Sequence, residues 1–247
     1  HKTTVGRVQT PTLAILVERE EKIKKFRPHD YWEIHATFAT DQGNYTGKWF
    51  DEKFSKDKVN QELKPERLWK KEAAEVIRDK CQGKTGHVIE ESKPSKEVCP
   101  LLYDLTSLQR DANSRFGFSA KTTLGLAQAL YEKHKVLTYP RTDSRALPED
   151  YIATVKDTLQ TFAHTAYEKF AQHILASKWV TPNKRIFNNA KISDHFAIIP
   201  TALNPAKLNE AETKLYDLVT KRFLAIFYPA AEFLITTRIT RVENEPF

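Results

Sequence analysis

The chain has 247 residues, of which 40% are hydrophobic and 29% are charged, so it is long enough for one large domain or two ordinary ones. Its formal net charge of +7 is compatible with nucleic acid, an anionic membrane surface or an acidic protein partner, and does not choose among them. Two cysteines are too few for a zinc site or a disulfide scaffold, and no apolar run approaches the roughly 18 residues that would span a membrane.

The first predicted helix covers residues 10–26, with Thr10 as N-cap and Pro11 at the first helical position. One face of this helix carries an apolar stripe of Leu13, Leu16, Val17, Ile23 and Phe26. The preceding residues, Arg7 and Gln9, stand at the helix N-terminus, which is a natural place to hold a phosphate group.

Apolar and polar residues alternate with period two in three later segments, which predicts half-buried strands. Residues 31–50 form a predicted hairpin around the turn TDQGN, and residues 85–94 and 232–242 alternate in the same way. We expect one antiparallel β unit built from both ends of the chain.

The middle of the chain is predicted to be helical, over residues 105–116, 120–134, 148–177 and 209–227. Thr106 is the expected N-cap of the first of these helices, Gly117 ends it, and Ser119 caps the second. Two helices joined by Phe-Gly-Phe resemble the helix-turn-helix arrangement of many DNA-binding proteins, which by itself is weak evidence for DNA.

The segment KVLTYPRTDS places a tyrosine and an arginine on either side of a proline. Pro140 fixes its own φ, and if the backbone stays extended, Tyr139 and Arg141 point the same way. A phenol is a fair leaving group once esterified, and a guanidinium matches two phosphate oxygens, so one hypothesis is covalent catalysis on a phosphodiester. The alternative, which spacing alone favours, is that Tyr139 packs beneath a turn while Arg141 pairs with Asp143.

Two further motifs are weaker. SDHFAIIPT contains Asp194 and His195 before an apolar run, where a lone histidine is more often structural. GKT at residues 83–85 suggests a phosphate-binding loop, but the pattern needs glycine where Arg78 stands, so the use of ATP is not supported.

The order of three segments resembles that of the type IA DNA topoisomerases. The segments read TTVGRVQTPTLAILVERE, then LLYDLTSLQRDANSRFGFSAKTTLGLAQALYEKHKVLTYPRTDS, then SDHFAIIPT. The likeness extends over essentially the whole chain, is most specific over residues 101–145, and is greatest to the bacterial topoisomerase III branch, in which proline follows the catalytic tyrosine.

This resemblance implies a role for each motif. Tyr139 would be the nucleophile that cuts one DNA strand and keeps its 5′ phosphate. Arg141 would contact the scissile phosphate, while His195, and less directly Asp194, would assist at the active site and contact DNA. The GRVQ segment would bind single-stranded DNA through Gly6, Arg7 and Gln9.

The resemblance also implies an α+β, multi-domain fold that forms part of a toroid, in which a β-rich arch carries a helical, helix-turn-helix-like tyrosine domain. The implied domains are a stub of the gate base at residues 1–28, the arch at residues 29–97 and 229–247, and the tyrosine domain at residues 98–228. Opening of the arch would let another strand pass.

One part of the family pattern is missing. The family binds Mg²⁺ through an acidic cluster in its Toprim domain, and no Asp-x-Asp motif occurs in this sequence. Because the chain also lacks methionine, we expect it to be a fragment. We expect the fragment to use no metal, cofactor or ATP, and to bind single-stranded DNA and no membrane. The parent enzyme is expected in the cytoplasm, at the bacterial nucleoid. We expect the fragment alone to bind DNA without cutting it.

Two other functions stay open. A tyrosine recombinase or type IB-like enzyme would leave a 3′ phosphotyrosine, but it needs a second arginine partner that is not evident in the sequence. A non-catalytic single-strand binding module could stack bases on aromatic residues of the predicted hairpin, although their strand spacing favours a core position. These aromatic residues are Tyr31, Trp32, Trp49 and Phe50.

Overall fold

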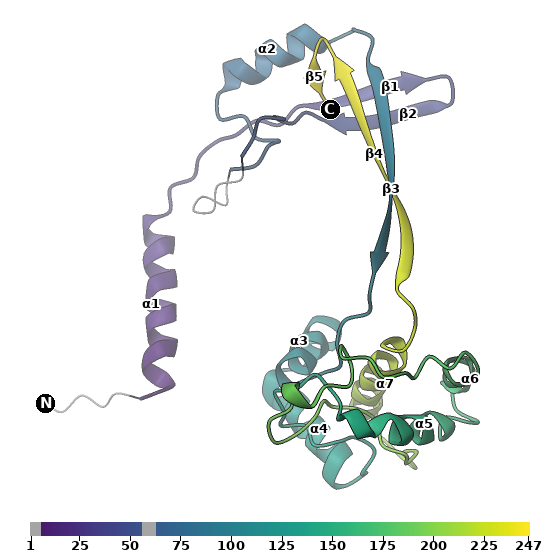
Figure 1. Ribbon diagram of the computed structural model, residues 1–247. Helices are drawn as coiled ribbons and strands as arrows, with labels where there is room; N and C mark the ends of the chain where they lie inside the picture. The colour runs from purple at the N-terminus through teal and green to yellow at the C-terminus, as the bar shows by residue number, and fades with distance from the viewer. Residues whose placement is uncertain (1–5, 56–62) are drawn as a thin grey trace, which may run out of the picture. The chain divides into compact units, whose positions relative to one another are not determined.

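The computed structural model describes residues 6–55 and 63–247, which combine helices and strands in an α+β fold. The chain divides into two compact units (Figure 1). Unit 1 contains the residues up to Lys93 and those from Ile235 onward, and unit 2 contains Pro94–Leu234. None of the helices within the described ranges is both long enough and apolar enough to cross a membrane. The finer division, with residues 1–28 as a separate domain, stays a prediction.

Unit 1 contains two small sheets. Strands β1 (His35–Thr40) and β2 (Gly43–Lys48) form the predicted hairpin, which turns at Gly43 with φ 129°. Only glycine adopts that backbone conformation without strain. The second sheet has the order β3–β4–β5, from β3 (His87–Glu97), β4 (Ala231–Val242) and β5 (Glu245–Pro246).

The two ends of the chain share one core in unit 1, as the sequence predicted, although they form two sheets rather than one. Trp49, Val242 and Phe247 are buried together, and Trp49 donates a hydrogen bond of 2.9 Å to Glu245. Tyr45 and Thr240 are joined by a side-chain hydrogen bond of 2.9 Å. Because Trp49 belongs to this core, the interpretation of that residue as a base-stacking group is wrong.

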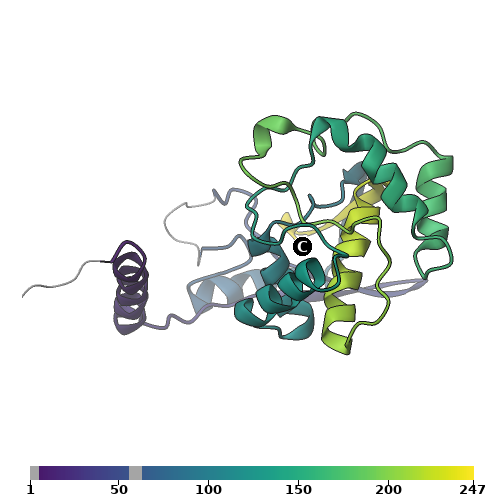
Figure 2. The ribbon, with the colours of Figure 1, turned by 90° about the horizontal axis from the view of Figure 1, so that it is seen from below.

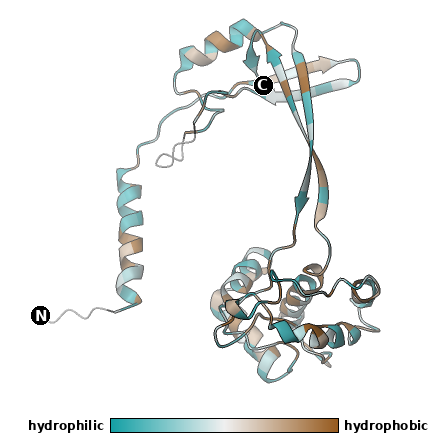
Figure 3. Ribbon diagram, in the orientation of Figure 1, coloured by the Kyte–Doolittle hydropathy of each residue, from teal (hydrophilic) through white to brown (hydrophobic). Residues whose placement is uncertain are grey.

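Helix α1 (Gln9–Lys25) begins one residue earlier than predicted. Val8 occupies the N-cap position, and the Thr10 hydroxyl instead accepts a hydrogen bond of 3.2 Å from the Gly6 amide. The prediction of Thr10 as N-cap is therefore wrong. No residue of α1 is buried, and its apolar residues stay exposed, as the brown band on this helix in Figure 3 illustrates.

Unit 2 is a bundle of helices, seen from below in Figure 2. Its α-helices are α3 (Leu105–Phe116), α4 (Ala120–Glu132), α5 (Ile152–Gln160), α6 (Glu168–Ala176) and α7 (Glu210–Ala225). Helix α7 contributes Leu215 and Val219 to one buried cluster and Phe223 to the other, so it joins the two cores of the unit.

Helix boundaries in unit 2 follow local capping. Asp104, rather than the predicted Thr106, caps α3, because its carboxylate accepts a 2.6 Å hydrogen bond from the Ser107 amide. Gly117 ends α3 in the left-handed conformation and Ser119 caps α4, both as predicted.

The predicted single helix over residues 148–177 is two α-helices, because residues 161–167 are not helical and His164 has φ 62°. The Thr165 hydroxyl donates to the Phe162 carbonyl at 2.6 Å, and this local hydrogen bond stabilises the turn between α5 and α6.

Candidate functional site

The segment that ends at Tyr139 is held against the SDHFAIIPT motif. The Thr138 amide donates to the Ile199 carbonyl at 3.0 Å, and the Thr138 hydroxyl accepts from the Ile199 amide at 2.9 Å. Ile198 in turn donates from its amide to the Tyr103 carbonyl at 2.8 Å. The segment that ends at Tyr139 and the segment at Tyr103 are therefore both paired with the SDHFAIIPT motif.

The ring of Tyr139 lies between two other rings. The His195 ring centre is 4.2 Å away at an interplanar angle of 44°, and the Tyr131 ring centre is 5.4 Å away in an edge-to-face arrangement. The ring is half-buried, and within the described ranges no hydrogen bond engages its hydroxyl group. The phenol is thus held in place by its ring while its oxygen stays available.

Arg141 is exposed and is held by Gln128 of α4, a residue that the sequence analysis did not single out. With the Gln128 amide turned so that its oxygen faces the guanidinium, that oxygen accepts from Nη2 at 3.1 Å and from Nε at 3.2 Å. Asp143 does not pair with Arg141, because its carboxylate accepts instead from the Ser193 hydroxyl at 3.3 Å. The alternative of an Arg141–Asp143 pair is therefore wrong.

The loop after Pro140 is fixed by buried hydroxyl groups. Thr142 donates to the His195 carbonyl at 2.9 Å, and its own carbonyl accepts from the Leu105 amide at 3.0 Å. The Ser144 hydroxyl donates to the Lys191 carbonyl at 2.9 Å. Both side chains are buried, so the loop that carries Arg141 has little freedom to move.

Two hollows open near this segment, one lined in part by His195 and the other by Tyr139 itself. The first, of about 470 Å³, is lined by Asp104, Leu105, Thr106, Arg141, Thr142, Asp143, Ser193, Asp194 and His195. The second, of about 630 Å³, contains Tyr139 itself together with Tyr131 and Phe196. The predicted residues Tyr139, Arg141, Asp194 and His195 are therefore brought together in unit 2.

A polar cluster lies around Tyr103, whose backbone pairs with Ile198. The Tyr103 hydroxyl donates to Asp111 at 2.6 Å, and Arg222 of α7 pairs with the same carboxylate at 2.9 Å. Arg222 also donates to the Leu101 carbonyl at 3.0 Å, and its guanidinium lies 4.2 Å from the centre of the Tyr103 ring. Burial, together with the hydrogen bond to Asp111, raises the pKa of Tyr103 far above the ordinary value, so this phenol stays protonated.

The acidic residues around Tyr139 do not converge as metal ligands do. Asp104 caps α3 and Asp143 accepts from Ser193. No group of three His, Cys, Asp or Glu side chains able to hold a metal ion occurs in residues 6–55 and 63–247. The described residues around Tyr139 thus form no cluster of carboxylates that by itself would enclose a metal ion.

The GRVQ segment belongs to unit 1. Arg7 and Gln9 are exposed at the start of α1, where the first backbone amides of the helix lack helical acceptors. Gly6 is next to them, and its amide is engaged by Thr10. The prediction that this segment marks a helix N-terminus is confirmed, and its contact with DNA stays a prediction.

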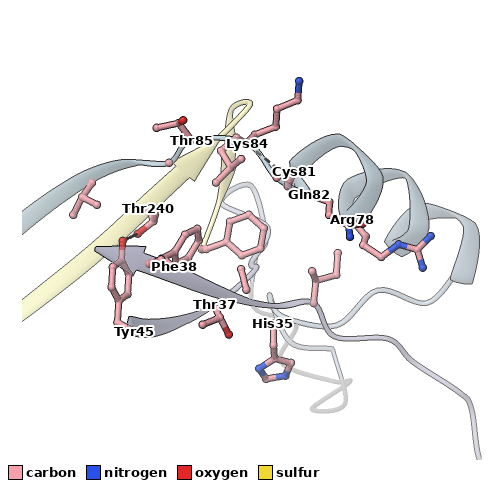
Figure 4. A pocket seen from close by; sticks show the side chains of 18 of the residues that line it. His35, Thr37, Phe38, Tyr45, Arg78, Cys81, Gln82, Lys84, Thr85 and Thr240 are labelled. Atoms are coloured by element: carbon pink, nitrogen blue, oxygen red, sulfur yellow. Dashed lines mark hydrogen bonds between the residues drawn. The ribbon is translucent and has the colours of Figure 1, made fainter. Parts of the chain in front are cut away.

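A separate hollow of about 730 Å³ lies in unit 1 between the hairpin, α2 (Lys71–Cys81) and the end of the chain. In Figure 4 its centre is occupied by aromatic rings such as Phe38, while the side chains of His35 and Lys84 point away from them. Residues 83–85, the partial phosphate-loop motif, follow a helix instead of preceding one. This hollow therefore lacks converging polar groups that would hold a ligand.

Comparisons with known proteins agree with one another. A family model described as DNA topoisomerase matches residues 1–247. Proteins named DNA topoisomerase 3 from Bacillus cereus and Bacillus subtilis are each 43% identical to the chain, over 252 and 245 residues. Each match covers 98% of this chain and 32% of the relative, so the chain spans about a third of the length of these relatives.

A solved structure has a similar fold. Full-length topoisomerase I from Thermotoga maritima matches 99% of this chain, with a TM-score of 0.60 and 22% identity, and the match covers 37% of that protein. At this identity the similarity concerns the fold alone.

Proposed function

This chain belongs to the type IA DNA topoisomerase family, and from that membership we propose that Tyr139 cuts a single DNA strand and holds the broken end for rejoining. The observation that carries the proposal is the Tyr139 hydroxyl, which no hydrogen bond engages within the described ranges, on a ring that packs against His195, a residue that shares a hollow with Arg141. The chain would act as the tyrosine-bearing part of a longer enzyme, since it covers 32% of its relatives.

The proposed reaction conserves the number of phosphoester bonds. The Tyr139 Oη attacks phosphorus, its bond to phosphorus forms, and the bond from phosphorus to O3′ breaks. The phenolic proton is lost as O3′ gains one, so the products are a 5′ phosphotyrosine and a free 3′ hydroxyl. Because one ester replaces another, the reverse attack by O3′ restores the strand without ATP.

Arg141 and His195 would stabilise the charge that develops on the phosphate oxygens. The Nε and one Nη of Arg141 face Gln128, which leaves the remaining N–H groups for the phosphate. His195 lies against the Tyr139 ring and shares a hollow with Arg141 and Asp194, so it can donate a hydrogen bond to a phosphate placed there.

The polarity of the covalent bond tests this function. An enzyme that contains this chain is incubated with one oligonucleotide labelled at its 5′ end and another labelled at its 3′ end, then run on a denaturing gel. We expect the protein to retain only the 3′ label, because a 5′ phosphotyrosine holds the segment on the 3′ side of the cut. Retention of the 5′ label would place the protein among the tyrosine recombinases or type IB-like enzymes.

The 247-residue chain is proposed to bind single-stranded DNA through its excess of positive charge and its GRVQ segment. Arg7→Ala is expected to weaken binding several-fold and to reduce the dependence of log affinity on log salt by about 0.7, which is the loss of one phosphate contact on a single strand. Fluorescence anisotropy of a labelled oligonucleotide at several salt concentrations measures both quantities.

Arg19→Ala is the matched control for Arg7→Ala, because it removes an exposed arginine from the middle of α1, away from the N-terminus of the helix. Its affinity and salt slope should change less than those of Arg7→Ala. Equal effects of the two substitutions would show that the segment contributes only general charge.

Mg²⁺ would be bound by ligands outside the described residues, such as the carboxylates of an acidic domain elsewhere in the enzyme. Isothermal titration of Mg²⁺ into this chain should therefore give no stoichiometric site of micromolar affinity. A saturable micromolar site would contradict this part of the proposal.

We also propose that the enzyme acts on the bacterial chromosome in the cytoplasm, which localisation of a tagged full-length protein would test.

A further inference from the structure

The hollow on the Tyr131 side of Tyr139 has no role in the reaction proposed above. Its walls come from the last turn of α4, the segment that ends at Tyr139, and the segment paired with it. The residues that line it are Tyr131, Glu132, Lys135, Leu137, Thr138, Tyr139, Phe196 and Thr201. All belong to unit 2.

Aromatic surface is available in this hollow. Tyr131 is 37% exposed although its edge packs against Tyr139. Phe196 is half-buried and is held from behind by the Tyr151 ring at 4.9 Å. An exposed ring on a rigid support offers a face on which a flat ring can stack.

Some polar side chains of the hollow already make hydrogen bonds within the protein, and others do not. Thr138 uses its hydroxyl to donate to Ala197 and to accept from Ile199, and the Thr201 hydroxyl donates to the Lys135 carbonyl at 2.7 Å. In the part of the chain that the structure describes, no ion pair engages Lys135 or Glu132. One cation and one anion are thus left for a ligand.

The backbone at Lys135 is held in an uncommon conformation. Its φ is 57°, in the left-handed region that non-glycine residues seldom adopt. The Thr201 hydrogen bond fixes the carbonyl, and the Val136 amide donates to the Leu130 carbonyl at 2.9 Å. These bonds end α4 in a left-handed turn and fix the backbone of Lys135, which lines the hollow together with Tyr131.

We propose that this hollow binds one unpaired nucleobase, that of the first nucleotide on the 3′ side of the cut. This inference rests on the proposed function, because it is the 5′ phosphate of that nucleotide which becomes bonded to Tyr139. The base of the same nucleotide must then lie within one sugar of the Tyr139 ring. The hollow with Arg141 and His195 takes the phosphate, and the hollow with Tyr131 is lined by the Tyr139 ring itself, which packs against His195.

The chemistry of the hollow suits a base. The base would stack on Tyr131, while Lys135 donates to a ring nitrogen or carbonyl and Glu132 accepts from an amino or imino group. A base within a duplex has its polar edge paired and its faces stacked, so it could not enter. The subsite thus selects single-stranded DNA at the position of the cut.

An abasic nucleotide tests the subsite in an enzyme that contains this chain. The cut in a single-stranded oligonucleotide is first mapped, and the base immediately 3′ of it is then removed. With Tyr131 present, the abasic nucleotide is expected to lower the yield of covalent adduct at limiting enzyme about tenfold. With Tyr131→Ala, intact DNA should already show this loss, and the abasic nucleotide should add nothing.

Two controls make the outcome specific. Tyr131→Phe keeps the ring, so the abasic nucleotide beside the cut should lower the yield of this variant by the same factor as in the unchanged enzyme. An abasic nucleotide three positions further in the 3′ direction should change the yield by the same factor with and without Tyr131. Tyr131→Leu, which retains an apolar side chain, replaces Tyr131→Ala if the latter unfolds.

Each result decides one of the two proposals. The abasic nucleotide beside the cut could lower the adduct yield by the same factor with and without Tyr131, or not lower it at all. Either result overturns the subsite and leaves the proposed function intact. A complete lack of adduct with intact DNA and the unchanged enzyme overturns the proposed function, and the subsite with it.

Discussion

Replacing Tyr139 with phenylalanine is expected to abolish the covalent adduct in an enzyme that contains this chain. The substitution removes one oxygen atom, and no other phenol can replace it, because Tyr131 meets Tyr139 only edge-on, with ring centres 5.4 Å apart. The ring contacts with His195 and Tyr131 remain, so the melting temperature should change by less than about 2 °C. Denaturing gels and a thermal melt measure the two effects.

Cleavage by Arg141→Lys provides a comparison for cleavage by Tyr139→Phe. Lysine keeps the charge but loses the planar fork that Gln128 holds, so cleavage should be reduced and not abolished. If cleavage survived Tyr139→Phe, the assignment of the nucleophile would be wrong. If that variant instead lost about 1–2 kcal/mol of stability and still cleaved DNA, the phenol would be a structural hydrogen-bond donor.

Arg222→Met is expected to destabilise unit 2 by about 2–4 kcal/mol. The change removes the cation beside Asp111 and the donor to the Leu101 carbonyl, and the Arg222 side chain is only 13% exposed. The carboxylate of Asp111 would then keep the Tyr103 hydroxyl as partner without its balancing charge. Chemical denaturation followed by circular dichroism gives the change in the free energy of unfolding.

Lys221→Met is the matched control for Arg222→Met, because it removes a cation from the next position of the same helix. Lys221 pairs with Asp217 at 2.7 Å, but its side chain is 68% exposed, so its loss should alter stability by less than about 0.5 kcal/mol. An equal effect of both substitutions would mean that the buried cluster contributes no more than a surface ion pair.

Local chemistry made part of this structure predictable. The hairpin at Gly43, the end of α3 at Gly117 and the cap of α4 at Ser119 each depend on a residue and its near neighbours. The motif around Tyr139 was predictable by resemblance, since spacing alone favoured an ordinary turn. The structure contradicts one part of that alternative, the Arg141–Asp143 pair, because Asp143 accepts from Ser193 and Arg141 is held by Gln128.

Other features depend on contacts that no local pattern reveals. Helix α2 was not predicted, although Ile77 and Cys81 lie one turn apart and pack against the core of unit 1. The helix is short and fully buries a single residue, Ala74, so its apolar face was easily overlooked in the sequence. The cluster of Tyr103, Asp111 and Arg222 joins residues more than 100 positions apart. Gln128 stands among helical residues, and its role becomes visible only when the loop after Pro140 folds back toward α4.

The paired strands β3 and β4 carry both passages of the chain between the two units. The Ser92 and Thr236 hydroxyls are hydrogen-bonded at 2.8 Å, and Lys96 pairs with Glu232 at 2.6 Å, so the two ends of unit 2 lie side by side. Unit 2 is thus topologically an insertion into one hairpin of its host. The 141 residues of this insertion, Pro94–Leu234, begin and end on neighbouring strands, so the strands that receive them stay paired. The same adjacency is what allows a domain to be gained, lost or exchanged between proteins without rebuilding the sheet that receives it.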